Sequence, residues 1–365
     1  NYLEKTTNKV LYEQKTVENK TFGDTVNSID EKIDIDGYKY DSVDKEMLTI
    51  QAGENVINIF YTKRNDLSYT VNYLEKGTNI VLHEPKAIEN KTFEEVITSS
   101  NEVIDIDGYN YNSIDKETLE ITTGENVINI YYTKRNDLSY TVNYLEKTTN
   151  KVLHSPKVTD NMTFATVIKS ADEVIKINGY NYNSVDKDSL TITTGTNVIN
   201  VYYTKVEGLS YTVNYLEKDT NKVIYPAKTT GNQVFESEIT SADEVIDIDG
   251  YNYDSVDKDN LIIGMDENII NIYYTRKNTK VIVHYFEENT TNKLSEDIEI
   301  SGKVFDEYTT NIADDVPIKY ELIAEPENKN GTMTEETIEV IYYYRVKDAI
   351  VNIRYLEKDT DEELS

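Results

Sequence analysis

The 365-residue sequence contains no cysteine and no tryptophan, and only three histidines and five prolines. Without cysteine, the chain cannot form disulfides, zinc-thiolate centres or thiol nucleophiles. The histidines, His83, His154 and His284, stand in no Ser-His-Asp or paired-histidine pattern, and no phosphate-binding loop occurs. His83 and His154 occupy a repeat position where other copies have tyrosine, which favours packing over catalysis. The sequence therefore predicts a protein that is not an enzyme and that uses no metal or cofactor.

Positive charge and long apolar runs are also scarce. Lysine and arginine total 37 against 67 aspartates and glutamates, so the formal net charge is −30. Nucleic acids and anionic membranes attract concentrated basic surfaces, and we expect neither as a partner. No run approaches the roughly eighteen apolar residues of a membrane span, and no signal peptide is present. Such charge is typical of a soluble extracellular array.

What the sequence has in abundance is repetition. The motif Tyr-Leu-Glu-Lys begins at Tyr2, Tyr73, Tyr144, Tyr215 and Tyr355, with a variant at Tyr285, so successive copies lie 71 or 70 residues apart. Gly-Tyr and Asn-Val-Ile-Asn motifs keep the same step. Self-similarity at a fixed period predicts an array of similar modules. Both ends lie inside a copy, so we expect the chain to be cut from a longer protein.

The period divides the chain into six stretches: residues 1–66 (repeat 1, N-terminally truncated), 67–137 (repeat 2), 138–208 (repeat 3), 209–278 (repeat 4), 279–346 (repeat 5, divergent) and 347–365 (the truncated start of repeat 6). Joints such as residues 63–68 are too short for free linkers. A module of this size buries a limited core, so contacts between neighbours should add stability. We therefore expect an elongated rod.

Repeat 2 predicts a module of the α+β class. Residues 68–74, 80–82, 119–122 and 127–133 have the alternation or β-branched content of strands, and residues 92–97 have the apolar spacing of one short helix. Glu95, three residues after Thr92, fits a helix cap. A mixed sheet covered by one helix, with the first and last strands paired centrally, would be a β-grasp-like module.

At these motifs the sequence resembles the mucin-binding-protein (MucBP) repeats of Gram-positive cell-surface proteins. The matching residues of repeat 2 are Val71-Asn72-Tyr73, Gly108-Tyr109 and Ile130-Tyr131-Tyr132-Thr133-Lys134, and those of repeat 5 are Gly331-Thr332-Met333-Thr334-Glu335 and Ile341-Tyr342-Tyr343-Tyr344. The resemblance implies a β-grasp-like module in an extracellular, often cell-wall-anchored protein of a mucosal bacterium, with a role in adhesion.

Tyrosines supply the candidate ligand site. The predicted glycan-binding residues follow the Gly-Tyr motif and are Tyr109, Tyr111, Tyr180, Tyr182, Tyr251 and Tyr253. Aromatic faces bind ligands that have apolar bodies and polar edges, although cross-strand packing is the alternative role. In the pairs Tyr131-Tyr132, Tyr202-Tyr203 and Tyr273-Tyr274, one ring should face the core and the other solvent. The Asp-Ile-Asp-Gly segments resemble part of a calcium loop, but a β-turn accounts for every copy, so no metal is assigned.

The leading functional hypothesis is the repeat region, or stalk, of a surface adhesin that binds mucin or other host glycoprotein glycans weakly at several modules. The alternative is a purely structural spacer or filament-forming element with no ligand. In that alternative, unpaired edge strands provide a route to self-association.

Overall fold

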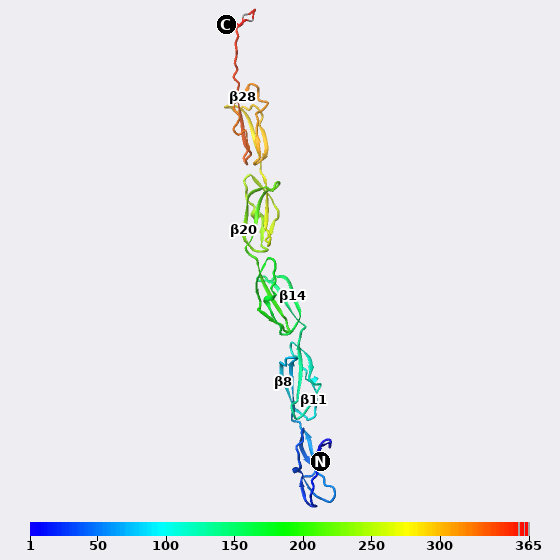
Figure 1. Cartoon of the computed structure of the whole chain (residues 1–365). Helices are drawn as coiled ribbons and strands as arrows, with labels where there is room; N and C mark the ends of the chain where they lie inside the picture. The colour runs from blue at the N-terminus through cyan, green and yellow to red at the C-terminus, as the bar shows by residue number, and fades with distance from the viewer. Residues whose placement is uncertain (357, 361, 364–365) are drawn as a thin grey trace. The chain divides into compact units, whose positions relative to one another are not determined.

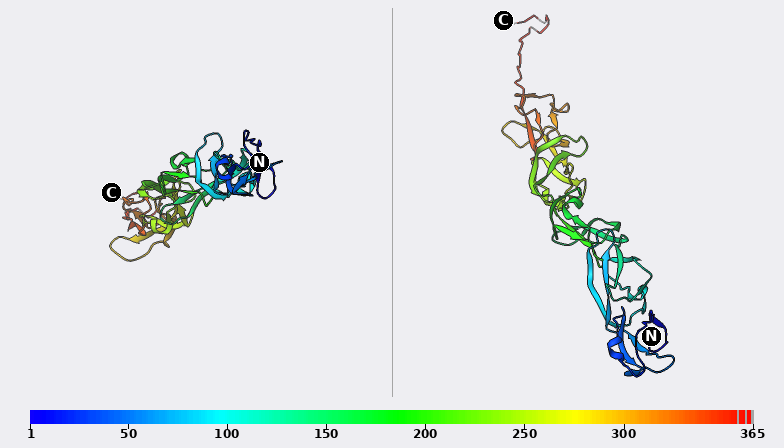
Figure 2. Two further views of the ribbon diagram at one scale, coloured as in Figure 1. Left: turned by 90° about the horizontal axis from the view of Figure 1, so that it is seen from below. Right: turned by 60° about the horizontal axis from the view of Figure 1, so that its bottom comes forward.

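The computed structural model describes residues 1–356, 358–360 and 362–363 (Figure 1). Part of the predicted sixth repeat, namely residues 357, 361, 364 and 365, lies outside the described residues. The chain divides into two compact units, Asn1–Ile175 with Tyr182–Tyr203, and Lys176–Asn181 with Thr204–Ser365. Strands dominate the ribbon in both views of Figure 2.

The second repeat shows the arrangement of strands. Its four-stranded sheet has the order β8-β7-β12-β10, and β9 pairs with β11 in a separate two-stranded sheet. At the centre, β7 and β12 run parallel, with Val71 opposite Ile128. The edge strands β8 and β10 are antiparallel to their neighbours. The predicted central pairing of the first and last strands is confirmed. Its elements are β7 (Leu67–Glu75), β8 (Val81–Lys91), β9 (Val96–Thr98), the 3-10 turn η2 (Ser99–Glu102), β10 (Tyr109–Ile114), β11 (Thr118–Glu120) and β12 (Val127–Lys134).

The same sheet order recurs in the other repeats as β2-β1-β6-β4, β14-β13-β18-β16, β20-β19-β24-β22 and β26-β25-β30-β28. Repeat 1 contains β1 (Tyr2–Glu4), β2 (Val10–Tyr12), β3 (Thr25–Asn27), η1 (Ser28–Glu31), β4 (Tyr38–Val43), β5 (Met47–Thr49) and β6 (Ile59–Lys63). Repeat 3 contains β13 (Leu138–Glu146), β14 (Val152–Met162), β15 (Val167–Lys169), η3 (Ser170–Glu173), β16 (Tyr180–Val185), β17 (Ser189–Thr191) and β18 (Val198–Lys205). Repeat 4 contains β19 (Leu209–Glu217), β20 (Val223–Gln233), β21 (Glu238–Thr240), η4 (Ser241–Glu244), β22 (Tyr251–Val256), β23 (Asn260–Ile262) and β24 (Ile269–Arg276). Repeat 5 contains β25 (Asn278–Glu287), β26 (Ile298–Lys303), β27 (Glu307–Thr309), β28 (Tyr320–Leu322), β29 (Asn330–Thr332) and β30 (Ile338–Val346).

The short helix predicted over residues 92–97 is wrong. Glu94 adopts a left-handed conformation with φ of 60°, and the chain continues into β9. The Glu95 carboxylate does accept a 2.9 Å hydrogen bond from the Thr92 N–H, as in a helix cap, but here it closes a turn. Ile97 then pairs with Leu119 of β11. β-branched residues such as Ile97 favour the extended backbone when a partner strand is available. Among the described residues the helical segments are four-residue 3-10 turns, so the modules are β rather than α+β.

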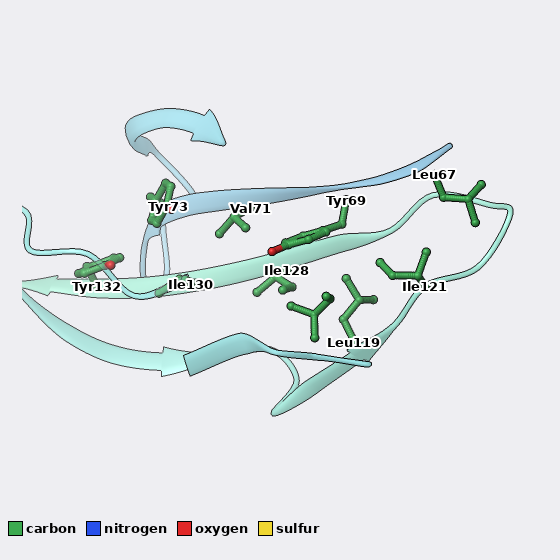
Figure 3. Packing of buried hydrophobic residues seen from close by; sticks show 10 residues of the cluster. Leu67, Tyr69, Val71, Tyr73, Leu119, Ile121, Ile128, Ile130 and Tyr132 are labelled. Atoms are coloured by element: carbon green, nitrogen blue, oxygen red, sulfur yellow. The ribbon is translucent and has the colours of Figure 1, made fainter. Parts of the chain in front are cut away.

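The core lies on one face of the central strands (Figure 3). The predicted alternation along β12 is confirmed, since Ile128, Ile130 and Tyr132 are at most 1% exposed while the residues between them are half-buried. Figure 3 shows Leu119 and Ile121 against this face. Burying each large apolar side chain stabilises the fold by about 1.5–3 kcal/mol relative to leaving it exposed.

In each of repeats 1 to 4, one tyrosine holds the extended crossover over the core. The Tyr132 hydroxyl donates to the Ile104 carbonyl at 2.8 Å and accepts from the Ile104 N–H at 3.2 Å. The same double contact joins Tyr61 to Ile33, Tyr203 to Ile175 and Tyr274 to Ile246. An extended crossover lacks the internal hydrogen bonds of a helix, and this hydroxyl supplies partners to its backbone.

Candidate functional site

The six predicted glycan-binding tyrosines fall into two groups. Tyr109, Tyr180 and Tyr251 pack against a phenylalanine of the following repeat, with ring centroids 5.6, 5.6 and 5.7 Å from Phe164, Phe235 and Phe305. The Tyr180 hydroxyl also donates to Glu236 at 3.1 Å. These three rings are therefore engaged in contacts between successive repeats.

The other three, Tyr111, Tyr182 and Tyr253, are each 49% exposed. Each presents one edge to the core tyrosine of its own repeat, as Tyr111 does to Tyr132 at a centroid distance of 6.3 Å. Because β10, β16 and β22 are edge strands, the remaining surface of each ring faces solvent. The structure thus leaves one half-exposed ring at the same position in three successive copies.

The outer face of the sheet carries the first tyrosine of each Tyr-Tyr pair. Tyr132, Tyr203 and Tyr274 are buried, whereas Tyr131, Tyr202 and Tyr273 are half-buried on the opposite face, which confirms the predicted split. Beside Tyr131, the Asn72 amide donates to Asn129 at 2.9 Å, and the Asn129 amide donates to Asp115 at 3.1 Å. Equivalent ladders join Asn143-Asn200-Asp186 and Asn214-Asn271-Asp257. These amides bind one another.

Repeat 5 replaces this polar ladder with aromatic and apolar residues. His284 pairs with Ile341 at the register position of the Asn72–Asn129 pair, and Phe286 pairs with Tyr343 at that of the Leu74–Tyr131 pair. The His284 and Phe286 rings stack with centroids 5.7 Å apart, and Tyr343 is 42% exposed. We call His284, Phe286 and Tyr343 the aromatic face. Sequence reasoning missed it, although the alternation of His284 and Phe286 could have indicated it.

Two charged groups adjoin the aromatic face. His284 Nδ1 lies 2.9 Å from Asp297 Oδ1, and the Lys293 ammonium lies 2.6 Å from Asp297 Oδ2. The hydrogen bond from Lys293, assisted by His284, holds the pKa of Asp297 below its usual value against the opposing effect of burial. Asp297 therefore stays ionised beside the histidine, so this end of the aromatic face is polar.

A second polar cluster that sequence reasoning missed lies at the edge of the core. Glu102 accepts hydrogen bonds from Tyr69 and Lys86, both at 2.8 Å. The clusters Tyr140-Glu173-Lys157 and Tyr211-Glu244-Lys228 repeat it. Burial raises the pKa of Glu102, but the hydrogen bonds from Lys86 and Tyr69 outweigh it, so the pKa lies below its usual value. Burial and the hydrogen bond to Glu102 raise the pKa of Tyr69.

This cluster predicts an acid-sensitive contribution to stability. A carboxyl group whose folded-state pKa is depressed stabilises the fold above its unfolded pKa of about 4.3, and the contribution is lost as the pH falls through the folded-state pKa. Hydrogen exchange of β7 and β8, corrected for intrinsic rates, should show stronger protection in the parent chain than in Glu102→Gln at pH 7. That difference should shrink below about pH 4.3. A difference that stays constant down to pH 2 would contradict the assignment.

A hollow in the first repeat is not shared by the next copy. Its lining includes Lys15, Glu31 and Ile57. In repeat 2 the corresponding place is filled by the first half of β7, where Val71 pairs with Lys86 on one side and Ile128 on the other. The hollow therefore does not define a ligand groove common to the repeats.

The histidines and the Asp-Gly turns have structural surroundings. His83 and His154 pack edge-on against Tyr73 and Tyr144. Gly37 adopts a φ of 78°, as the turn interpretation requires.

No group of three or more His, Cys, Asp or Glu side chains that could hold a metal occurs within residues 1–356, 358–360 and 362–363. In this same part of the chain, no helix has the length and apolar character needed to cross a membrane.

Comparison with known proteins identifies the family of one repeat. Residues 280–345 match the model of the MucBP domain. No curated protein matches the chain. Among solved structures, the chain is similar to streptococcal SHIRT (Streptococcal High Identity Repeats in Tandem) domains 3-4 from a cell surface protein, with 14% sequence identity and a TM-score of 0.20 over 38% of this chain and 98% of that chain. It is similar to the Bacillus anthracis TIE protein with 10% identity and a TM-score of 0.32 over 86% of this chain and 76% of that chain. It is similar to Mub-RV with 14% identity and a TM-score of 0.16 over 58% of this chain and 100% of that chain.

Five successive mixed β-sheet modules of one strand order define a tandem-repeat region. The match to the MucBP domain lies within the fifth repeat and agrees with the resemblance noted in the sequence.

Proposed function

We propose that this chain is the stalk of a bacterial surface adhesin, which projects from the cell wall and binds mucin glycans weakly at several repeats at once. The recurrence of one half-exposed ring, at Tyr111, Tyr182 and Tyr253, carries the proposal. Tyrosine offers an apolar face to a sugar ring and a hydroxyl to its polar edge. Linked weak sites gain avidity without any new contact, so repetition makes such rings useful.

The proposal extends the MucBP assignment from repeat 5 to the four repeats that precede it. Their shared sheet order, with parallel first and last strands at the centre, supports a β-grasp-like module in which extended chain and a 3-10 turn replace the usual helix. We place the module boundaries at residues 66/67, 137/138, 208/209, 278/279 and 346/347, and the protein outside a Gram-positive cell, either secreted or anchored to its wall.

A spacer without a ligand is the second candidate, and a specific observation favours it. Tyr109, Tyr180 and Tyr251 are occupied by contacts between repeats, and the amides of the outer face bind one another. Under this alternative the repeats serve only to hold another part of the protein away from the cell.

Retention of the full chain on immobilised intestinal mucin, before and after enzymatic removal of the glycans, separates the two candidates. We expect glycan-dependent retention that falls at least tenfold in a triple variant with Tyr111, Tyr182 and Tyr253 replaced by Ser, because each lost site reduces avidity multiplicatively. A separate Tyr343→Ser variant measures the contribution of the aromatic face.

The chain offers a matched control for the triple variant. Val81, Val152 and Val223 are 56–62% exposed at another shared position of repeats 2–4. Replacing these three by Ser removes exposed apolar side chains that are not aromatic and should leave retention unchanged. No retention of the parent chain, or equal loss in both triple variants, would favour the spacer.

A further inference from the structure

Each repeat from 2 to 5 places a phenylalanine on a glycine of the repeat before it. Phe93 lies on Gly37, Phe164 on Gly108, Phe235 on Gly179 and Phe305 on Gly250, and a Cβ atom added at any of these glycines would overlap the ring. The tyrosine that follows each glycine packs against the same ring, as Tyr38 does against Phe93 at a centroid distance of 5.6 Å. The glycine is thus required by the close approach of the neighbour.

Backbone hydrogen bonds continue this contact across each joint. The Arg64 N–H donates to the Gly37 carbonyl, and the Phe93 N–H donates to the Arg64 carbonyl, both at 2.9 Å. The same relay occurs at the next joint, where the Arg135 N–H donates to the Gly108 carbonyl at 2.9 Å and the Phe164 N–H donates to the Arg135 carbonyl at 2.8 Å. It occurs again where the Val206 N–H donates to the Gly179 carbonyl and the Phe235 N–H donates to the Val206 carbonyl, both at 2.9 Å. In the last joint, Lys277 donates to Gly250, and Val304 to Lys277. The residue at each joint therefore donates a backbone hydrogen bond to the repeat before it and accepts one from the repeat after it.

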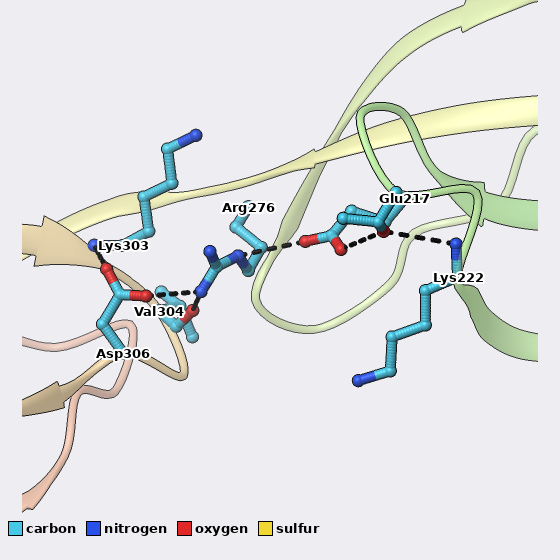
Figure 4. A network of polar contacts seen from close by, with 7 residues as sticks. Glu217, Lys222, Arg276, Lys303, Val304 and Asp306 are labelled. Atoms are coloured by element: carbon cyan, nitrogen blue, oxygen red, sulfur yellow. Dashed lines mark hydrogen bonds and ion pairs between the residues drawn. The ribbon is translucent and has the colours of Figure 1, made fainter.

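Ion pairs also connect neighbouring repeats at the first, third and fourth joints, and the paired residues differ from joint to joint. Lys63 pairs with Glu94 at 2.7 Å, and Lys205 with Glu236 at 3.2 Å. Figure 4 shows Arg276 between Glu217 of its own repeat at 3.0 Å and Asp306 of the next at 2.6 Å. At the joint of repeats 2 and 3, Ala165 stands where the acid would be. The aromatic-glycine contact and the backbone relay are present at every joint from repeat 1 to repeat 5.

Repeats 1 and 5 each differ from the others at one of the two residues that form this contact. Phe22 of repeat 1 sits on the equivalent turn, where the Thr21 N–H donates to Asp24 at 2.8 Å, yet its side chain is 77% exposed. At the other end, Lys319 replaces the glycine in repeat 5, and its ammonium lies 5.1 Å from the centroid of Tyr320. Repeat 5 therefore lacks the glycine surface that receives a phenylalanine in the repeats before it.

We propose that the phenylalanine turn is a docking surface whose partner is the Gly-Tyr end of the preceding repeat, and that this docking couples the folding of repeats 1 to 5. The coupling runs through a phenylalanine ring in contact with a glycine, which has no side chain, and through a relay of backbone hydrogen bonds. It operates whether or not the exposed tyrosines bind glycans.

The test replaces a residue in one repeat and measures the stability of its neighbour. Phe93→Ala in the full chain should lower the hydrogen-exchange protection of β4 and β6 in repeat 1 by about three- to tenfold, the range typical of an aromatic contact. A purely internal role of Phe93 would leave β4 and β6 unchanged and would overturn the proposal. Phe22→Ala is the matched control, with the same substitution on the same turn, and should leave repeat 2 unchanged.

A second variant covers the case in which Phe93→Ala unfolds its own repeat. Gly37→Ala lies in repeat 1, and its Cβ atom meets the Phe93 ring, so the amide of Phe93 in repeat 2 should lose protection. Gly53→Ala is the control, because Gly53 also has positive φ, of 106°, but has no atom within 4 Å of an added Cβ. If both glycine variants affect only repeat 1, docking does not couple the repeats.

Discussion

Replacing Ile130 by Ala is expected to destabilise the second repeat by about 2–5 kcal/mol. Ile130 is fully buried at the centre of β12, opposite Tyr73 on the parallel strand β7. The substitution loses the transfer free energy of the deleted atoms and leaves a cavity, since neighbouring strands cannot collapse onto it without breaking their register. A loss of this size is comparable to the whole stability of a small module.

Hydrogen exchange of the β7 and β12 amides would measure this loss, with repeats 3 and 4 in the same chain as internal references. Val96→Ala is the control, because Val96 is 61% exposed in the same repeat. The control should change stability by less than about 0.5 kcal/mol. A loss below 1 kcal/mol for Ile130→Ala would show that the core is packed less tightly than the structure implies.

Removing a single oxygen atom, in Tyr132→Phe, should cost about 1–3 kcal/mol. The phenylalanine ring keeps the apolar contacts, but the N–H and carbonyl of Ile104 both lose their partner. These hydrogen bonds are part-buried, and leaving a desolvated backbone group unpaired costs more than an ordinary hydrogen bond contributes.

Tyr111→Phe is the matched control, since it removes the same oxygen from a ring that is half-exposed. Denaturation of both variants, followed by hydrogen exchange of residues 103–107, should show a selective loss of protection in Tyr132→Phe. Equal effects of the two substitutions would mean that the Tyr132 hydroxyl does not hold the crossover.

The alternation of apolar residues predicted the central strands and the core face correctly. Within residues 127–133 every second residue is buried, as the sequence pattern indicates. This succeeds because the period of two is a property of the strand itself and needs no knowledge of distant residues.

The predicted helix failed for the opposite reason. The spacing of Phe93, Val96 and Ile97 suits a helix, but Ile97 pairs with Leu119, more than twenty residues away. Phe93 also packs outward on Gly37 of the preceding repeat and not only on its own core. Local propensity is a weak prior when contacts of this range supply most of the stability.

The sequence by itself determined the repeat period, the strand faces and the exclusion of thiol chemistry, because each follows from residue type and spacing along the chain. Only the tertiary structure decided which tyrosines stay accessible. Tyr109 and Tyr111 are two residues apart and lie on the same face of one strand, so their pattern is identical. What separates them is the ring of Phe164, which reaches Tyr109 from the next repeat and leaves Tyr111 to solvent.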